Sequence, residues 1–272
     1  MALIDLHKLN KSHGEKPVKD IDKPVVFDER LEYSCPARGT WTIAHSTMLV
    51  PGSHQIFVGA SACLRGVVLS AAEYDGLDRF SMLMIDEQNI IGGNMEDLFI
   101  DGITDIIEQL PYTPNIIWIF SSCIHHFLST DFNYINRKLS ENFPCIDFVN
   151  CSMHPTMRKN RPNAEEHLRT QLYTPLTGRR NSPVYNNSVN IIGNNEPIKT
   201  SSDYMKMLMS SGIKVNDLAS CTDYDEYLAM RNSCLNIYSL PNAKYCCEQL
   251  KKKLNQDFIY LPLTWNMKKI KE

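Results

Sequence analysis

The sequence lacks the phosphate-binding motifs of the common nucleotide-binding folds. No GxxxxGK(S/T) string occurs, so we expect no ATP site of the P-loop type in this chain. No GxGxxG string follows a predicted strand, which argues against an NAD site of the Rossmann type. Any ATP hydrolysis linked to this protein is therefore expected to belong to a partner.

Long apolar runs, a secretory leader and an excess of basic residues are also missing. The apolar runs are too short to span a bilayer, and the first residues lack the positive region and apolar run of a signal peptide. The formal net charge of −3 gives no overall basic field for nucleic acid or anionic lipid. We therefore expect a cytoplasmic protein with no nucleic acid and no membrane among its partners.

The nine cysteines are odd in number and come without a secretory signal. This combination favours reduced thiols or metal ligation over a disulfide scaffold. Cysteine chemistry is therefore the first place to look for function.

Apolar segments of strand length alternate with segments of helix length along most of the chain. Parallel strands need long crossover connections, and helices between successive strands supply them. The sequence therefore predicts an α/β protein with two Rossmann-like domains and parallel sheets. The predicted strands cover residues 55–59, 81–85, 115–120 and 146–149, then 189–192, 214–218, 235–238 and 258–261. The predicted helices cover residues 64–73, 94–110, 127–142, 163–176, 202–210, 224–232 and 243–254.

The composition also suggests where the domains end. Residues 1–24 are polar and are expected to form an N-terminal arm, before a first domain over 25–177. Turn-forming residues concentrate at 178–187, which favours a linker there. The second domain is expected over 188–272 and is expected to be truncated or a short form, because a further helix is predicted to begin near residue 266.

Three cysteines lie in three different loops of the first predicted domain, namely Cys35, Cys63 and Cys123. The last two follow directly after strands predicted to be buried and parallel, where such folds bind their ligands. Small residues flank each thiol, so that the backbone can approach a bulky inorganic group. Spacings of 28 and 60 residues do not match a zinc finger, a CxxC redox pair or a bacterial ferredoxin. If the three thiols form one site, the fold must bring them together.

Simpler interpretations stand beside this one. Cys123, His125 and His126 could form a thiol nucleophile with a nearby base or part of a zinc site, but no orienting carboxylate is evident. His45 and His54 could tune a nearby metal group, although hydrogen-bonded structural histidines are commoner. The other six cysteines are expected to be small buried apolar side chains: Cys145, Cys151, Cys221, Cys234, Cys246 and Cys247.

Four strings carry a resemblance to a known family. They are Cys35-Pro-Ala-Arg-Gly39, Pro51-Gly-Ser-His-Gln-Ile-Phe-Val-Gly-Ala-Ser-Ala-Cys63, Ile91-Gly-Gly-Asn-Met-Glu-Asp-Leu98 and Ser121-Ser-Cys-Ile124. With these strings the first domain resembles the nitrogenase component 1-like oxidoreductases, which include the nitrogenase molybdenum-iron protein and its nitrogenase-like relatives. The resemblance covers most of residues 30–260, densely in the first domain and weakly in the second.

The resemblance implies a set of ligands and partners. Cys35, Cys63 and Cys123 match the cysteines that anchor an iron–sulfur cluster, of the 4Fe-4S kind or larger, at a subunit interface. Three thiolates leave one position open, so a homodimer or a related heterodimer is expected to complete the site. The electron donor implied is an ATP-binding iron–sulfur reductase. Arg38 and Arg65 follow two of these cysteines and would stabilise the reduced cluster, unless they form ordinary salt bridges.

The departures from the family pattern are equally informative. In nitrogenase proper, a second-domain cysteine at a strand end and a histidine of a third domain hold the catalytic cofactor. Here Ser239 and Leu240 stand in place of that cysteine, and the third domain is absent from the sequence. Nitrogen fixation is therefore not expected, and the tetrapyrrole-reducing relatives are nearer analogues.

The interpretation that follows is a nitrogenase-like catalytic component, or part of one, acting on an unknown substrate. A non-catalytic scaffold that assembles or transfers a metallocluster is the alternative from a different class. A third possibility is an interaction module with vestigial cysteines, which would bind no metal.

Overall fold

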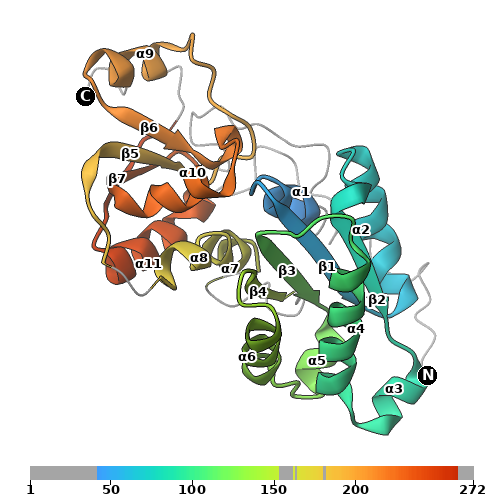
Figure 1. Ribbon diagram of the computed structural model, residues 1–272. Coiled ribbons are helices and arrows are strands. Elements are labelled where there is room, and N and C mark those ends of the chain that lie inside the picture. Colours follow the sequence, from blue (N-terminus) through green and yellow to red (C-terminus); the bar gives the residue numbers. More distant parts are fainter. Residues whose placement is uncertain (1–41, 153–161, 163, 180–181, 263–272) are drawn as a thin grey trace, which may run out of the picture. The chain divides into compact units, whose positions relative to one another are not determined.

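The computed structural model describes residues 42–152, 162, 164–179 and 182–262 (Figure 1). All of these residues belong to one unit of contacting chain, residues 33–262. The predicted arm and the residues around Cys35 and Arg38 lie outside the described residues. No helix in the described ranges is long and apolar enough to cross a membrane.

The first sheet has four parallel strands in the order β2-β1-β3-β4. Every residue of the two central strands, β1 and β3, is buried, as expected for parallel strands covered on both faces. The strands match the four predicted in the first half of the chain, within a few residues at each end. Their bounds are β1 (Ser53–Gly59), β2 (Phe80–Met84), β3 (Ile116–Ser121) and β4 (Asp147–Ser152).

Helices cover both faces of this sheet (Figure 1). Alternate residues of β1 and β3 point to opposite faces, so Phe57 and Phe120 join the cluster that includes α1 (Thr42–Met48) and α2 (Ser61–Glu73). Ile56 and its neighbours on the other face join a second cluster with α4 and α6. The remaining helices here are α3 (Glu87–Gly92), α4 (Met95–Gln109), α5 (Cys123–Phe127) and α6 (Phe132–Asn142), with a short 3-10 helix at Leu77–Arg79.

Two differences from the predicted helices have local causes. The segment 127–142 is not one helix, because Ser129 has a left-handed φ of 54° and α6 begins only at Phe132. The Asp131 carboxylate then accepts hydrogen bonds from the backbone N–H groups of Asn133 and Tyr134, both at 3.0 Å. The short helices α1 and α3 were not predicted, since neither carries a repeated apolar period.

The second sheet repeats the same topology, with parallel strands in the order β6-β5-β7-β8. The prediction of two parallel sheets with helical crossovers is therefore confirmed. β5 begins at Asn186, inside the segment 178–187. The strands are β5 (Asn186–Ile192), β6 (Lys214–Asp217), β7 (Ser233–Tyr238) and β8 (Asp257–Tyr260), and the helices are α9 (Asp203–Ser210), α10 (Tyr224–Ala229) and α11 (Lys244–Leu254). Short 3-10 helices lie at Leu218–Ser220, Met230–Asn232 and Pro241–Ala243.

Two short helices lie between the sheets in sequence. They replace the single helix predicted over 163–176, because the chain turns at Leu172 and Tyr173 and Pro175 falls in the first turn of the second helix. The first of them, α7 (Ala164–Gln171), contacts both β4 and α11, and α8 (Thr174–Thr177) follows directly.

Side-chain amides cross the second sheet from strand to strand. Asn216 donates to Asn190 at 3.3 Å, and Asn190 donates to Asn236 at 2.8 Å. The row continues from Asn236 to Gln256 at 3.2 Å, and Gln256 donates to the Met230 carbonyl at 2.9 Å. Because buried amides cost free energy when unpaired, this row favours a single strand register.

His54 is held neutral at the amino end of β1. Its Nδ1 lies 2.8 Å from the Tyr112 hydroxyl, and its Nε2 lies 2.8 Å from Ser81 Oγ. The Tyr112 hydroxyl donates its one proton to the Asp78 carbonyl at 3.1 Å, so Nδ1–H must donate to Tyr112 and Ser81 must donate to Nε2. Burial lowers the pKa of His54 to about 4, against a smaller opposite effect of the Asp78 carboxylate.

This histidine predicts a pH dependence of stability. Between pH 6.5 and about 4 the unfolded chain binds a proton at His54 that the folded chain does not bind, so the free energy of unfolding falls as the pH falls. The decrease in the free energy of unfolding approaches about 3 kcal/mol at the lower end of this pH range. Urea unfolding of the wild type and His54→Gln at pH 4.5 and pH 7 measures it. The variant should lose less stability on acidification, and equal losses in the two proteins would contradict the assignment.

Candidate functional site

The loop after β1 carries Cys63 at the carboxyl edge of the first sheet. β1 ends at Gly59, and α2 begins at Ser61, so that Cys63 lies in the first turn of α2 with an exposed thiol. Its backbone N–H donates to the Ala60 carbonyl at 2.9 Å, which fixes the turn. A Cβ at Gly59 would lie 3.3 Å from Ser122 Oγ, so the small residue lets this loop approach the loop after β3.

The loop after β3 carries Cys123, the first residue of α5. Its thiol is half-buried, and the preceding Ser121 and Ser122 are buried. Ser121 Oγ has no hydrogen-bond partner among the described residues. This loop therefore brings a partly accessible thiol and a buried hydroxyl to the sheet edge.

The strand order places these two loops together. β1 and β3 are parallel neighbours, with Val58 paired to Ser121, so their carboxyl ends lie side by side. The chain runs from β1 outward to β2 and then returns past β1 to β3, which makes the boundary between β1 and β3 the switch point of the sheet. Ligands of open α/β sheets bind at such points. Cys63 and Cys123 thus flank the position where the fold favours a ligand.

The other residues of the expected ligand set are less informative. Cys35 and Arg38 lie outside the described residues. Arg65 is exposed on α2, and it forms no ion pair with a residue that the structure describes. Within the described ranges no three His, Cys, Asp or Glu side chains are grouped to hold a metal ion. The described part of the chain therefore contributes two thiols to the expected site.

The histidines near these cysteines have structural environments. His125 is fully buried, with its Nε2 3.4 Å from the Val58 carbonyl and its ring edge-on to Phe99 at 4.8 Å. This orientation gives no support to a base for Cys123. His54 lies at the amino end of β1, opposite to Cys63, and His45 stacks on Tyr74 at 4.0 Å. Burial lowers the pKa of His45 as well.

The remaining cysteines differ in their exposure. Cys151, Cys246 and Cys247 are fully buried, as predicted for small apolar side chains. The same prediction is wrong for Cys145 and Cys234, which are exposed, while Cys221 is half-buried. Cys145 lies in the loop before β4, and Cys234 lies at the start of β7. Whether other segments cover such positions depends on the tertiary structure, and the local composition does not encode it.

Sequence reasoning missed the polar residues at the carboxyl edge of the second sheet. Arg169 of α7 is buried and donates from Nη1 to the Gly193 carbonyl at 2.5 Å and from Nη2 to Glu165 at 3.2 Å. Asp217 ends β6 and accepts from the Ile198 N–H at 3.2 Å, and its burial raises its pKa. Asp217 lies at the end of a predicted strand, which was an available signal, whereas a single arginine in α7 gave none.

The comparisons with known proteins agree with this fold. The family model described as nitrogenase component 1 type oxidoreductase matches residues 43–271. A solved structure of nitrogenase Cp1 at pH 6.5 has a TM-score of 0.60 and 12% identity, covering 87% of this chain and 56% of that chain. A structure of nitrogenase Cp1 at pH 5 has a TM-score of 0.59 and 14% identity, covering 85% of this chain and 50% of that chain. The chain thus spans about half the length of these proteins. It matches no curated protein.

Thiol accessibility predicts a labelling pattern for the reduced, metal-free chain. Brief treatment with iodoacetamide should modify Cys63, Cys145 and Cys234, which are exposed, and spare Cys151 and Cys247, which are buried. Burial also raises the pKa of Cys247 to about 12, so little thiolate is present. Peptide mass spectrometry reads the pattern, with the urea-unfolded chain as the control in which every cysteine reacts. If Cys151 were labelled as fast as Cys234, the buried position of Cys151 would be contradicted.

Proposed function

The chain belongs to the nitrogenase component 1 type oxidoreductase family, and from this premise we propose that it is a nitrogenase-like catalytic component. In this proposal Cys35, Cys63 and Cys123 bind an iron–sulfur cluster that receives electrons from an ATP-dependent iron–sulfur reductase. The observation that carries the proposal is that Cys63 and Cys123 directly follow two neighbouring strands, β1 and β3, at the switch point of the first sheet.

The donor set fits an iron–sulfur cluster. Thiolates are soft ligands that favour iron–sulfur clusters over hard cations. A cluster of the 4Fe-4S kind or larger, when bound, would take up and release electrons one at a time. Gly59 lets the loop that carries Cys63 approach Ser122, and the Ser121 hydroxyl is a buried polar group near Cys123 with no hydrogen-bond partner among the described residues. Arg65 would add positive charge beside Cys63 and so stabilise the reduced state.

Exposed apolar side chains support a protein partner at this edge. Met84 ends β2 and is 63% exposed, while Ile91 of α3 is 85% exposed and Phe127 of α5 is 73% exposed. All three follow or end strands at the carboxyl edge that carries Cys63 and Cys123. Exposed apolar side chains favour burial by a partner when they form one contiguous patch, and we infer that these three do. We assign the edge to the second subunit of a homodimer or related heterodimer, which completes the cluster ligation, and to the reductase.

A metallocluster scaffold would use the same three thiols. One observation favours it: Ser239 follows β7 at the edge of the second sheet, and no thiol occupies that position for a second cofactor. Reductase-dependent turnover separates the two functions. A catalytic component oxidises the reduced partner continuously when substrate is supplied, whereas a scaffold exchanges its cluster with an acceptor protein and turns over nothing.

The cluster assignment predicts the effect of single cysteine replacements. Cys63→Ala or Cys123→Ala should remove most of the iron and sulfide bound after anaerobic reconstitution, because two thiolates hold a cluster poorly. Cys234→Ala is the matched control, since Cys234 is also exposed but lies on β7. Iron and sulfide analysis with circular dichroism of each variant tests this. Equal iron in all three variants would refute the ligand assignment.

The partner surface predicts an oligomer that depends on one aromatic side chain. The anaerobic, iron-loaded chain should be a dimer by light scattering, and Phe127→Asp should shift it to monomer, because a charge would have to be buried in the interface. Val184→Asp is the control, since Val184 is 78% exposed and lies before β5. A wild-type monomer with full iron content would mean that one chain supplies all the cluster ligands, and the proposed dimer interface would be refuted.

A further inference from the structure

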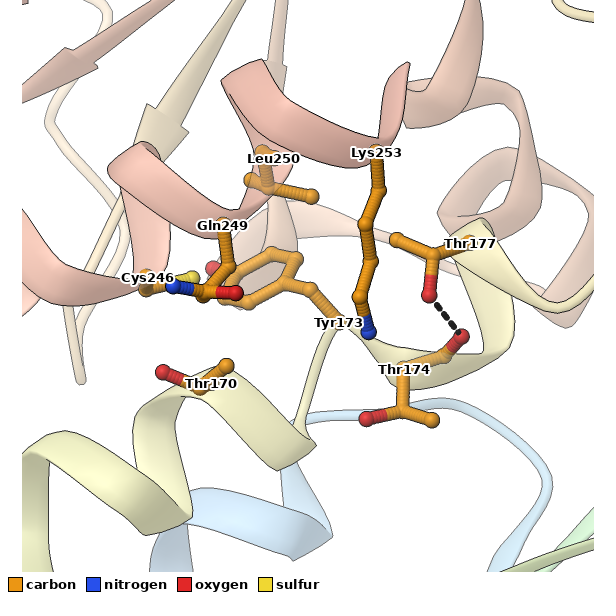
Figure 2. Close-up of a pocket in the computed structure, with 8 residues that line it drawn as sticks. All are labelled: Thr170, Tyr173, Thr174, Thr177, Cys246, Gln249, Leu250 and Lys253. Atoms are coloured by element: carbon orange, nitrogen blue, oxygen red, sulfur yellow. Dashed lines mark hydrogen bonds between the residues drawn. The ribbon is translucent and has the colours of Figure 1, made fainter.

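A small pocket lies between α7, α8 and α11 (Figure 2). Thr170, Thr174 and Thr177 line one side of it, and Gln249 and Lys253 of α11 line the other. Its enclosed space of about 10 Å³ has room for roughly one water molecule, so it is too small for a cofactor or a substrate. A buried polar group at the switch point of the first sheet is more informative.

Ser122 lies between the two loops that carry Cys63 and Cys123. It directly precedes Cys123, the first residue of α5, and its side chain packs against the end of β1. A Cβ at Gly59 would lie 3.3 Å from Ser122 Oγ and 3.4 Å from Ser122 Cβ. Only 5% of the serine is exposed. A hydroxyl group is therefore enclosed where the two thiol-bearing loops meet.

The direction of this side chain follows from the strand before it. Alternate residues of a strand point to opposite faces, so Ser121 shares with Ile119 the face of β3 that packs against α4 and α6. Ser122 has extended backbone, with φ −84° and ψ 173°, and continues the alternation onto the face that α2 covers. The two neighbouring hydroxyls thus diverge, and that of Ser122 is the one directed toward the loop of Cys63.

The helix that follows does not use the Ser122 hydroxyl. A serine at this position normally accepts a hydrogen bond from a backbone N–H of the first helical turn, but the Ser122 side chain makes no such bond. The His125 N–H donates to the Ser122 carbonyl instead, at 3.3 Å. The hydroxyl has no hydrogen bond to a residue that the structure describes. Because buried hydroxyls are normally hydrogen-bonded, its acceptor has to come from elsewhere.

We propose that the Ser122 hydroxyl donates a hydrogen bond to a sulfur atom of the iron–sulfur cluster or of its cysteine ligands. This inference rests on the proposed function and adds to it a residue that tunes the cluster. Hydrogen bonds to the sulfur atoms help to set the reduction potential of such clusters. A donor beside sulfur offsets part of the negative charge that reduction adds, so it stabilises the reduced form and raises the potential. A higher potential favours electron transfer from the reductase.

The experiment compares three variants of the full-length chain after anaerobic reconstitution. Ser122→Ala removes the hydroxyl, whereas Ser122→Thr keeps it at a position where threonine is also favoured. Ser53→Ala is the matched control, because Ser53 is buried as well but lies at the amino end of β1, where its hydroxyl donates to the Thr47 carbonyl at 3.0 Å. Iron and sulfide analysis measures the bound cluster, and circular dichroism measures folding. A redox titration followed by electron paramagnetic resonance measures the reduction potential.

Ser122→Ala is expected to keep the wild-type iron content and to have a more negative reduction potential, while Ser122→Thr and Ser53→Ala keep the wild-type value. An unchanged potential in Ser122→Ala, or the same shift in Ser122→Thr, would overturn the role of the hydroxyl and leave the cluster assignment intact. Loss of iron in Ser122→Ala would make Ser122 a ligand or a structural requirement, which also contradicts a hydrogen-bond donor. A wild-type chain that binds no cluster would refute the proposed function and this inference with it.

Discussion

The strand order of the first sheet is the constraint on which the candidate site depends. β1 lies between β2 and β3, so the chain leaves β1 in one direction and returns past it before entering β3. The helices that follow these two strands lie on opposite faces of the sheet, α2 with one core cluster and α6, after α5, with the other. The connections that follow β1 and β3 therefore leave the same edge of the sheet toward opposite faces. Cys63 and Cys123 lie at the start of these two connections.

Local packing then determines how that edge can be used. Gly59 allows the loop after β1 to approach Ser122, and the His125 ring fills the space between Val58 and Phe99. His125, which the sequence offered as a possible base for Cys123, is instead part of the core. Cys63 is exposed and Cys123 is half-buried, whereas Ser121, Ser122 and His125 beside Cys123 are buried.

The second sheet repeats the strand order but uses it differently. Its interior contains the row of amides from Asn216 to Gln256, and its carboxyl edge carries Gly193, Asp217 and Ser239, with the Cys221 thiol donating to the Asp217 carbonyl. Buried amides satisfied along a row fix the register without offering free groups to a ligand. The same topology thus carries different side chains at the carboxyl edges of the two sheets.

The sequence by itself determined the alternation of strands and helices and the position of Cys63 and Cys123 after buried strands, because both follow from local apolar period and chain order. The tertiary structure alone decided the breaks at Ser129 and Leu172 and the exposure of Cys145 and Cys234. It also decided the partners of His54, since Ser81 and Tyr112 are distant in sequence. Burial and hydrogen-bond partners depend on which segments pack together, and a local pattern carries no information about residues far along the chain.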